Sequence, residues 1–249
     1  MKVNIKYALL AVLVATMALA ADARTYTNET LNYEIVFHWG AVWKHAGDAK
    51  LSISKSGNGY QSTLVGKTRS WADKIYPVRD TLKSKMKSNF APLRYEKHTH
   101  ENGYYARDIV NFTYNYSNTS ATCKRYRKGK PVKTVNLSAK CQAYDMVSVF
   151  YMLRDIDYAK LATNKTLTTV IFSGKQKEYL TIRYKGVENV KMRNGTKRQA
   201  YHITFKFTQE GGKKSSDDIS AWMSTDASRI PLVLVGKLPV GEVKCYYAG

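Results

Sequence analysis

Polar and apolar residues alternate along most of this chain, and this pattern constrains the fold more than any other feature. In the segment TLKSKMKS, for example, Lys83, Lys85 and Lys87 occupy alternate positions and must share one strand face. Roughly a dozen or more such segments follow one another, mostly separated by short turns, which is typical of an antiparallel meander. A sheet of so many strands has to curl or close to protect its edges. We therefore predict a mainly β fold: an antiparallel meander curled into a barrel-like or half-barrel domain, with one short helix packed against it.

The register of one hairpin follows from an Asn-Gly pair. Asn102–Gly103 separates two strand-like segments, and Asn-Gly is strongly preferred in two-residue hairpin turns. A two-residue turn at this point places Tyr95 opposite Val110 and Lys97 opposite Asp108. The core-facing side of the second strand is then expected to carry Val110, Phe112, Tyr114 and Tyr116.

One segment breaks the alternation. Between Asp145 and Arg154 the apolar residues recur at the 3.6-residue spacing of a helix. Asp145 occupies an N-cap position and Arg154 lies in the last turn, where each charge complements the helix dipole. About ten residues are marginal as an isolated helix, so we expect this helix to plug the curled sheet and bury its apolar side. The residues on that side are Met146, Val149, Phe150 and Leu153.

The same helix carries candidate ligand-binding residues. Asp145, Ser148 and Tyr151 repeat at three-residue spacing on one side of it and could form a site. The alternative is structural: Asp145 caps the helix, Ser148 bonds the backbone, and Tyr151 packs with its hydroxyl in water. The structural interpretation is favoured.

The N-terminus has the form of a secretory signal peptide. Two lysines precede an apolar run of about 13 residues, too short to span a bilayer comfortably, which ends in the small-residue pattern Ala18–Ala20. Cleavage after Ala23 is an alternative. We predict a signal peptide at residues 1–20, a single β-barrel-like domain at 21–249, and a periplasmic location. No later segment approaches about 18 apolar residues, so we expect no membrane span in the mature chain. The first cysteine is Cys123, so we do not expect a lipoprotein.

The net charge restricts the partners of such an exported protein. Without residues 1–20 the chain has 38 basic and 19 acidic residues, a net charge of +19. In the cytoplasm this would suggest nucleic acid, but export makes the predicted partners anionic lipid, glycan or envelope protein, with no nucleic acid. Lys83, Lys85 and Lys87 are the candidate binding residues. The slightly favoured alternative is that they are ordinary solvated lysines that keep a sheet edge from pairing.

The chain has three cysteines, so one stays unpaired if a disulfide forms within the chain. Cys123 and Cys141 flank a predicted hairpin, so they could form a disulfide in an oxidising compartment. Two cysteines buried apart is the alternative.

The sequence contains no motif that indicates catalysis or a cofactor. Neither a nucleophile elbow nor a glycine-rich phosphate loop occurs. Glu96, His98 and His100 share one strand face and look like metal or acid–base groups. A single exposed face offers no enclosure, so a solvated polar face is favoured over a metal site. We predict a non-enzymatic protein without a cofactor.

Short motifs follow one another in order along nearly the whole chain. They are Gly40; Gly47, Ala49 and Leu51; Pro77 to Asp80; Pro92, Leu93 and Tyr95; Glu101, Gly103 and Tyr104; Phe112; Asp145, Ser148, Tyr151 and Arg154; and Trp222, Ser224, Asp226, Arg229 and Pro231. This ordered set resembles the exported bacterial family called domain of unknown function 3108. The resemblance implies a barrel-like domain but no activity and no catalytic residues. The middle of the chain, from Tyr114 to Lys140, does not follow the family pattern, which leaves the two strands there undetermined.

We expect from these features a non-catalytic module of the cell envelope. It would hold an amphiphile, a glycan or another envelope component in the concave face of its sheet. The alternative is a structural or interaction protein of the envelope without a small ligand. An apolar interior cavity would favour the first and a filled core the second.

Overall fold

The computed structural model describes residues 24–210, 218–237 and 241–249. The predicted signal peptide at residues 1–20 lies outside the described residues. Of the helices in the described ranges, none is long and apolar enough to cross a membrane.

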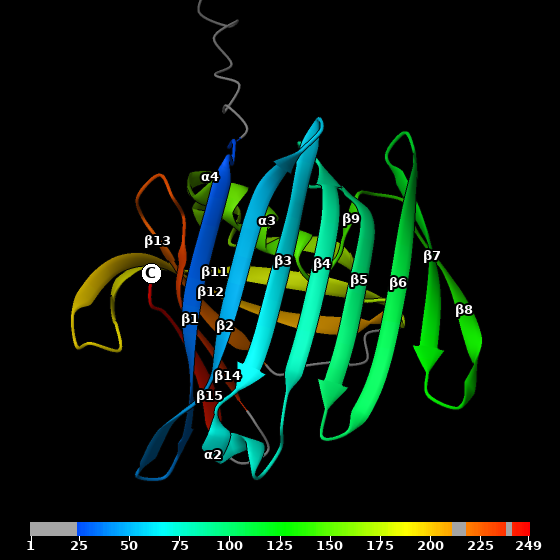
Figure 1. Cartoon of the computed structure of the whole chain (residues 1–249). Helices are drawn as coiled ribbons and strands as arrows, with labels where there is room; N and C mark the ends of the chain where they lie inside the picture. Colours follow the sequence, from blue (N-terminus) through cyan, green and yellow to red (C-terminus); the bar gives the residue numbers. More distant parts are fainter. Residues whose placement is uncertain (1–23, 211–217, 238–240) are drawn as a thin grey trace, which may run out of the picture.

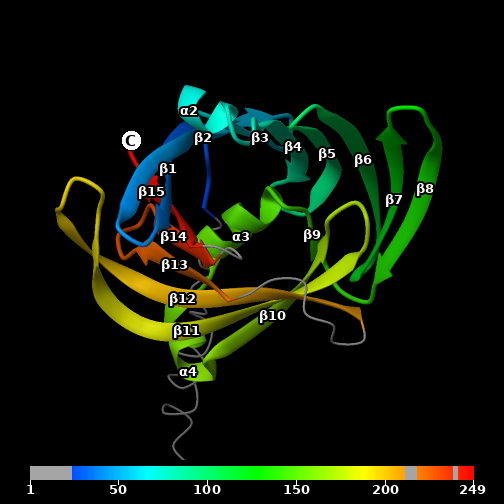
Figure 2. The ribbon, with the colours of Figure 1, turned by 90° about the horizontal axis from the view of Figure 1, so that it is seen from below.

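In the described residues, fifteen strands form one sheet that curls into a nearly closed barrel, which confirms the predicted fold class (Figures 1 and 2). The sheet runs in the order β8-β7-β6-β5-β4-β3-β2-β1-β15-β14-β13-β12-β11-β10-β9, so the first and last strands of the chain pair with each other. All neighbours are antiparallel except β9 and β10. The strands are β1 (Asn28–Trp39), β2 (Val42–Ser56), β3 (Gly59–Thr68), β4 (Arg79–Lys87), β5 (Pro92–Glu101), β6 (Tyr104–Asn115), β7 (Asn118–Arg127), β8 (Lys130–Ala139), β9 (Ala143–Tyr144), β10 (Thr166–Phe172), β11 (Lys177–Lys191), β12 (Lys197–Gln209), β13 (Ile219–Ser224), β14 (Pro231–Lys237) and β15 (Glu242–Tyr247).

The prediction of a single helix is wrong, because the described residues contain three. They are α2 (Ser70–Asp73), α3 (Ser148–Asp155) and α4 (Tyr158–Asn164). The predicted helix corresponds to α3. The sequence pattern did not reveal α4, since seven residues are too few to show a periodicity. Its limits are local: the Asp157 side chain accepts from the amides of Ala159 and Lys160, and Lys165 ends the helix in a left-handed conformation.

The predicted register of the β5–β6 hairpin is confirmed. Tyr95 lies opposite Val110 and Lys97 opposite Asp108. Val110 and Phe112 are buried as expected. Tyr116 is not: it lies in the turn after β6 and is 99% exposed. The alternation of sides therefore ends with the strand, one residue before Tyr116. The undetermined middle of the chain forms two paired strands, β7 and β8, with one register shift between Arg125 and Arg127.

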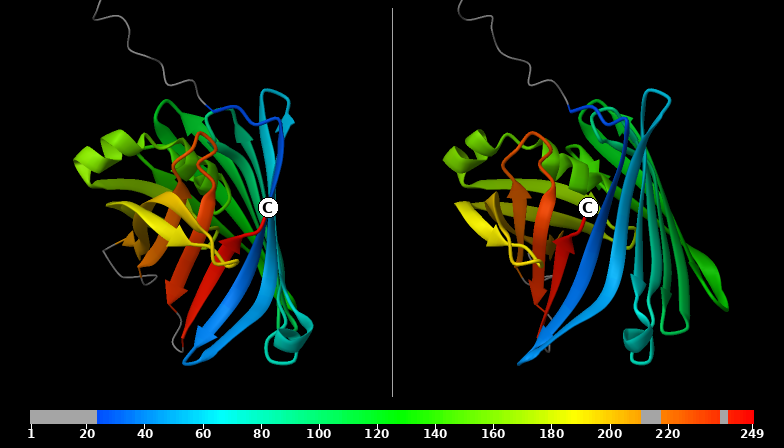
Figure 3. Two further views of the ribbon diagram at one scale, coloured as in Figure 1. Left: turned by 90° about the vertical axis from the view of Figure 1, so that its left-hand side faces the viewer. Right: turned by 60° about the vertical axis from the view of Figure 1, so that its left-hand side comes forward.

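Helix α3 lies in the concave face, between the N-terminal wall (β1–β8) and the C-terminal wall (β10–β15), as Figures 2 and 3 show. One buried cluster joins Tyr151 and the N-cap residue Val147 to the N-terminal wall, and a second joins Val149 and Leu153 to the C-terminal wall. The predicted burial holds for Val149 and Leu153. Met146 and Phe150 are only half-buried, and they lie where the two clusters meet. The side of the helix that faces the N-terminal wall is its polar side, which does not carry these two residues.

The Cys123–Cys141 disulfide is absent, and both residues are free cysteines. The register of β7 and β8 explains why. Cys123 lies opposite Val135, and Cys141 comes after the end of β8, where it is exposed. Cys123 is completely buried under the N-terminal wall, where burial raises the pKa of its thiol to about 11.

Candidate functional site

The polar side of α3 is more deeply buried than its apolar side. Asp145, Ser148, Tyr151 and Arg154 are each at most 1% exposed. Asp145 accepts hydrogen bonds from the Val147 and Ser148 amides at 2.7 Å, but the N-cap position of α3 is Val147 and not Asp145 as predicted. Its second carboxylate oxygen accepts from Ser84 Oγ of β4 at 2.5 Å. Complete burial raises the pKa of this carboxyl to about 6, against the opposing effect of the hydrogen bond from Ser84.

Two further contacts tie the same side of the helix to the sheet. The Tyr151 hydroxyl lies 2.8 Å from Ser62 Oγ of β3. It is buried, whereas the sequence analysis placed this hydroxyl in water. The Arg154 guanidinium donates to both carboxylate oxygens of Glu29 in β1, at 2.5 and 2.8 Å. It also donates to the Ser228 carbonyl, in the turn between β13 and β14. Asp145, Ser148 and Tyr151 therefore have their partners inside the protein, which supports the structural interpretation of these candidates.

The three candidate lysines lie on the opposite face of the sheet from this cluster. Lys83, Lys85 and Lys87 are exposed on the outer side of β4, while Ser84, between them, points inward to Asp145. The sequence-derived candidates thus form two groups separated by the sheet, and the structure does not bring them together. Lys83 also lies opposite Glu96 of β5, an acidic neighbour that reduces the local positive potential.

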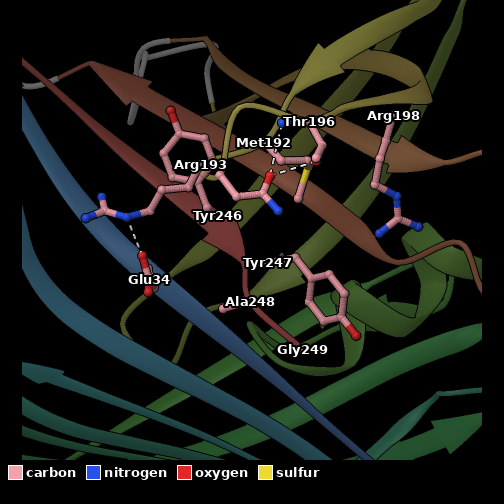
Figure 4. A pocket seen from close by; sticks show the side chains of 10 residues that line it. Glu34, Met192, Arg193, Thr196, Arg198, Tyr246, Tyr247, Ala248 and Gly249 are labelled. Atoms are coloured by element: carbon pink, nitrogen blue, oxygen red, sulfur yellow. Dashed lines mark hydrogen bonds and ion pairs between the residues drawn. The ribbon is translucent and has the colours of Figure 1, made fainter.

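A pocket of about 580 Å³ lies where the chain end meets the β11–β12 turn (Figure 4). Two of its lining residues are arginines, but both are paired: Arg193 with Glu34, and Arg198 with Asp226 at 3.5 Å. Because these carboxylates neutralise the arginines, this pocket has little net charge with which to attract an anion.

A groove of about 480 Å³ at one end of the barrel has a different composition. It lies where β4 and β6 begin and where β5 and β7 end, at the lower end of the barrel in Figure 1. We call it the rim groove. Its lining contains three arginines, a lysine, two histidines and two tyrosines but no carboxylate. The lining residues are Arg79, His98, Thr99, His100, Tyr105, Ala106, Arg107, Tyr126, Arg127 and Lys128.

The cations of the rim groove fall into two kinds. Arg79 and Arg127 are held by carboxylates at 2.7 Å, Arg79 by Asp73 and Arg127 by Asp108. The hydrogen bond from Arg79 lowers the pKa of Asp73 to about 2. By contrast, no ion pair within the described ranges holds Arg107 or Lys128. The rim groove therefore combines fixed guanidinium groups with free positive charge.

Aromatic rings support the free groups. The Arg107 guanidinium lies over the Tyr126 ring, 4.5 Å from its centroid. The His100 ring stacks on Tyr105, with centroids 3.9 Å apart and planes 25° apart. Stacking on an aromatic face orients a guanidinium while leaving its N–H groups able to donate. This arrangement can bind a planar or tetrahedral anion such as carboxylate, sulfate or phosphate.

The sequence did not predict the rim groove, although part of its signal was present. The hairpin register places His98 opposite Arg107 and His100 opposite Tyr105, as the structure confirms. What the sequence could not show is that β4, β7 and the turn after β7 add Arg79, Tyr126 and Lys128 beside them. Glu96 accepts from His98 at 3.0 Å, and the described residues contain no cluster of three or more potential metal ligands.

The concave face, where a ligand was expected, is occupied by α3 and by the two buried clusters. Tyr95, Val110, Tyr151 and Phe172 are each completely buried there. Phe172 stacks against Phe112, which packs the end of β10 on the inner side of β6. The pockets described above lie outside this core.

Comparisons with known proteins identify a family and a fold. The family model described as "Protein of unknown function (DUF3108)" matches residues 32–247. No curated protein sequence matches the chain. Among solved structures, the chain is similar to a beta-barrel-like protein of domain of unknown function DUF1849 from Brucella abortus. The TM-score is 0.62 at 10% sequence identity, over 89% of this chain and 96% of that one. At this identity the likeness supports the fold alone.

Proposed function

Since the chain belongs to the DUF3108 family, which has no assigned activity, we propose a function from its own geometry: it is a non-catalytic binding module of the cell envelope, and the rim groove takes an anionic group of an envelope component. The ligand class is a phosphate or carboxylate group on a lipid or glycan. The proposed setting is the periplasm, after removal of residues 1–20.

One observation carries this proposal: the lining of the rim groove has no carboxylate and includes Arg107 and Lys128, which no ion pair within the described ranges holds. In the pocket at the chain end, by contrast, both arginines are paired. Charged groups that keep no internal partner are available to an external anion, and charge-assisted hydrogen bonds are about twice as strong as neutral ones. The aromatic rings beneath Arg107 and beside His100 add faces on which a sugar or an acyl-glycerol could pack.

Calorimetric titration of the mature protein tests this function. The probes are a short-chain phosphatidylglycerol below its micelle concentration and an oligomer of glucuronic acid, so that phosphate and carboxylate are compared. We expect Arg107→Glu to weaken binding about tenfold or more, since a hydrogen bond to a charged group contributes about 1.5–3 kcal/mol. Lys85→Glu is the matched control, because Lys85 is exposed on the outer wall away from the groove.

The alternative function is an envelope scaffold without a small ligand. The specific observation in its favour is the filled concave face, which leaves the interior to α3 and its packing partners. Under this alternative the rim groove is a solvated end of the barrel. The titration separates the two: if neither probe binds, or if Arg107→Glu and Lys85→Glu lower the affinity equally, the binding function is rejected in favour of the scaffold.

A further inference from the structure

The rim groove is one part of a longer row of chain segments at the same end of the barrel. This row consists of the β1–β2 hairpin tip, the α2 connection, the β5–β6 turn and the β7–β8 turn, all at the lower end in Figure 1. We call it the rim end and define it as residues 42–44, 74–76, 104–107 and 128–130.

Contacts join these four segments into one continuous surface. Trp71 Nε1 of α2 donates to the His45 carbonyl of β2 at 2.6 Å. The Asn102 amide donates to the Pro77 carbonyl at 2.8 Å, which fixes the α2 connection beside the β5–β6 turn. Arg107 over Tyr126 then links that turn to the end of β7. The segments are therefore held side by side by the fold, although they are far apart in the sequence.

The rim end exposes an unusual number of large apolar side chains. Twelve large hydrophobic residues of the described ranges are exposed, and six of them lie at the rim end: Val42, Trp43, Ile75, Tyr76, Tyr104 and Tyr105. Among these six, Ile75 is 73% exposed, and each of the other five is about half exposed. Apolar groups gathered on one surface indicate an interaction site, whereas single ones do not.

Positive charge accompanies these side chains. Lys44, Lys74, Arg107, Lys128 and Lys130 are exposed at the rim end. Two acidic groups beside these segments are already engaged: Asp73 holds Arg79, and Glu101 accepts from the Tyr76 hydroxyl at 3.3 Å. The surface thus combines aromatic and aliphatic groups with uncompensated cations.

The opposite end of the barrel does not share the cluster of exposed apolar side chains. Its tips are the short turns after β2, β4 and β6, at residues 57–58, 88–91 and 116–117. Tyr116 is the one large apolar side chain that is exposed among those eight turn residues, although Lys55 and Lys87 are exposed beside them. The two ends therefore differ in exposed apolar surface, while both carry positive charge.

We propose that the rim end docks on the surface of an anionic lipid bilayer. Tyrosine and tryptophan favour the interface between acyl chains and headgroups, and lysine and arginine are attracted to anionic headgroups. In this orientation the aromatic and aliphatic side chains enter the interface, and the rim groove receives a headgroup phosphate. This inference rests on the proposed function, because it names lipid as the source of the anion.

Vesicle co-sedimentation of the mature protein tests this docking. The probes are vesicles of phosphatidylglycerol with phosphatidylcholine, and vesicles of phosphatidylcholine alone. We expect binding only to the anionic vesicles and a steep loss of binding as salt rises. Each lysine removed from an anionic surface lowers partitioning about fivefold, so Lys74→Glu with Lys128→Glu should lower it by more than twentyfold. Lys83→Glu with Lys85→Glu, on the outer wall, is the charge-matched control and should retain most of the binding.

A second pair of variants isolates the apolar contribution. Ile75→Ser with Tyr104→Ser removes two exposed side chains at the rim end, and Val187→Ser with Tyr116→Ser removes two elsewhere. We expect the first pair to lose about tenfold or more in vesicle binding and the second to behave as the native protein. Brominated lipids should quench the native tryptophan emission, and Trp43→Phe should remove most of this quenching.

The outcomes separate this inference from the function on which it rests. If the soluble probes bind the rim groove but anionic vesicles do not sediment the protein, docking is overturned and the binding function stands. Vesicle binding that is equal for the rim and control variants overturns docking at this end. If neither soluble probes nor vesicles bind, both proposals fail.

Discussion

The two sides of helix α3 are held in the barrel by different kinds of interaction. The side toward the N-terminal wall uses hydrogen bonds and an ion pair, from Asp145, Tyr151 and Arg154 to three different strands. The side toward the C-terminal wall uses apolar packing, chiefly by Val149 and Leu153. Polar contacts require a particular partner at a particular distance, whereas apolar packing tolerates adjustment. The comparison teaches that the N-terminal wall fixes where the helix sits, and the C-terminal wall covers it.

Arg154→Ala should have the largest effect on stability. The guanidinium is 1% exposed, and its removal leaves the Glu29 carboxylate without this donor and the Ser228 carbonyl with Arg24 as its side-chain donor. Loss of one partner of a buried ion pair destabilises a protein by about 3–5 kcal/mol. Urea denaturation followed by circular dichroism measures this loss.

The control for Arg154 is an exposed pair. Arg94→Ala removes an ion pair with Glu96 at 2.8 Å in which the arginine side chain is 44% exposed, and it should change stability by about 0–1 kcal/mol. If the two variants lose similar stability, the polar side does not determine the position of the helix.

Leu153→Ala tests the apolar side. Leu153 is 4% exposed and packs in the second cluster, so its truncation should destabilise the protein by about 2–5 kcal/mol. Phe150→Ala should have a smaller effect, about 1.5–3 kcal/mol, because Phe150 is only half-buried. Urea melts in which Phe150→Ala is the more damaging variant would contradict this assignment of the two residues.

A pH dependence sharpens the comparison, because Asp145 is the titratable group at the centre of the polar side. Its folded pKa of about 6 lies above the value of 3.8 for the free side chain. The folded state thus binds the proton more tightly, which stabilises the protein below about pH 4. This stabilisation is lost as the pH rises through 6, a difference of about 3 kcal/mol. In Asp145→Asn the amide oxygen can still accept from the helix amides, so this variant should lack that contribution.

The measurement is the difference in unfolding free energy between the native protein and Asp145→Asn, followed across this pH range. We expect the native protein to lose stability relative to the variant between pH 4 and pH 6. A difference that is constant with pH would show that Asp145 titrates normally.

The smallest stability effect is expected on the outer face of β4. Reversal of Lys83, Lys85 and Lys87 to glutamate should change the free energy of unfolding by about 0.5 kcal/mol or less per site, because exposed positions tolerate substitution. Ser84 lies on the inner face of the same strand. Ser84→Ala should destabilise the protein more than the triple lysine variant, because it removes the donor to the buried Asp145 carboxylate. Comparable melts for the outer triple variant and for Ser84→Ala would remove the distinction between the two faces.

Local signals in the sequence were sufficient for much of the fold. The Asn102–Gly103 turn and the two-residue period fixed the register of β5 and β6, since both act between neighbouring residues. The period of 3.6 located α3, but the sequence placed its N-cap at Asp145, two residues before the N-cap at Val147. The same local logic failed for α4, which is too short to show a period, and for Tyr116, where the strand had already ended.

The sequence by itself determined that this chain forms a curled antiparallel sheet with a helix inside it, because alternation and turn chemistry are properties of adjacent residues. Only the tertiary structure decided which side of the helix is buried most deeply. Arg154 pairs with Glu29, which is 125 residues away, and no sequence pattern near either residue predicts this ion pair. The same holds for the rim groove, whose arginines, lysine and tyrosines come from three strands and an adjoining turn. These side chains form one groove only because the folded sheet brings the ends of those strands together. Such clusters depend on distances that the chain defines only after it has curled.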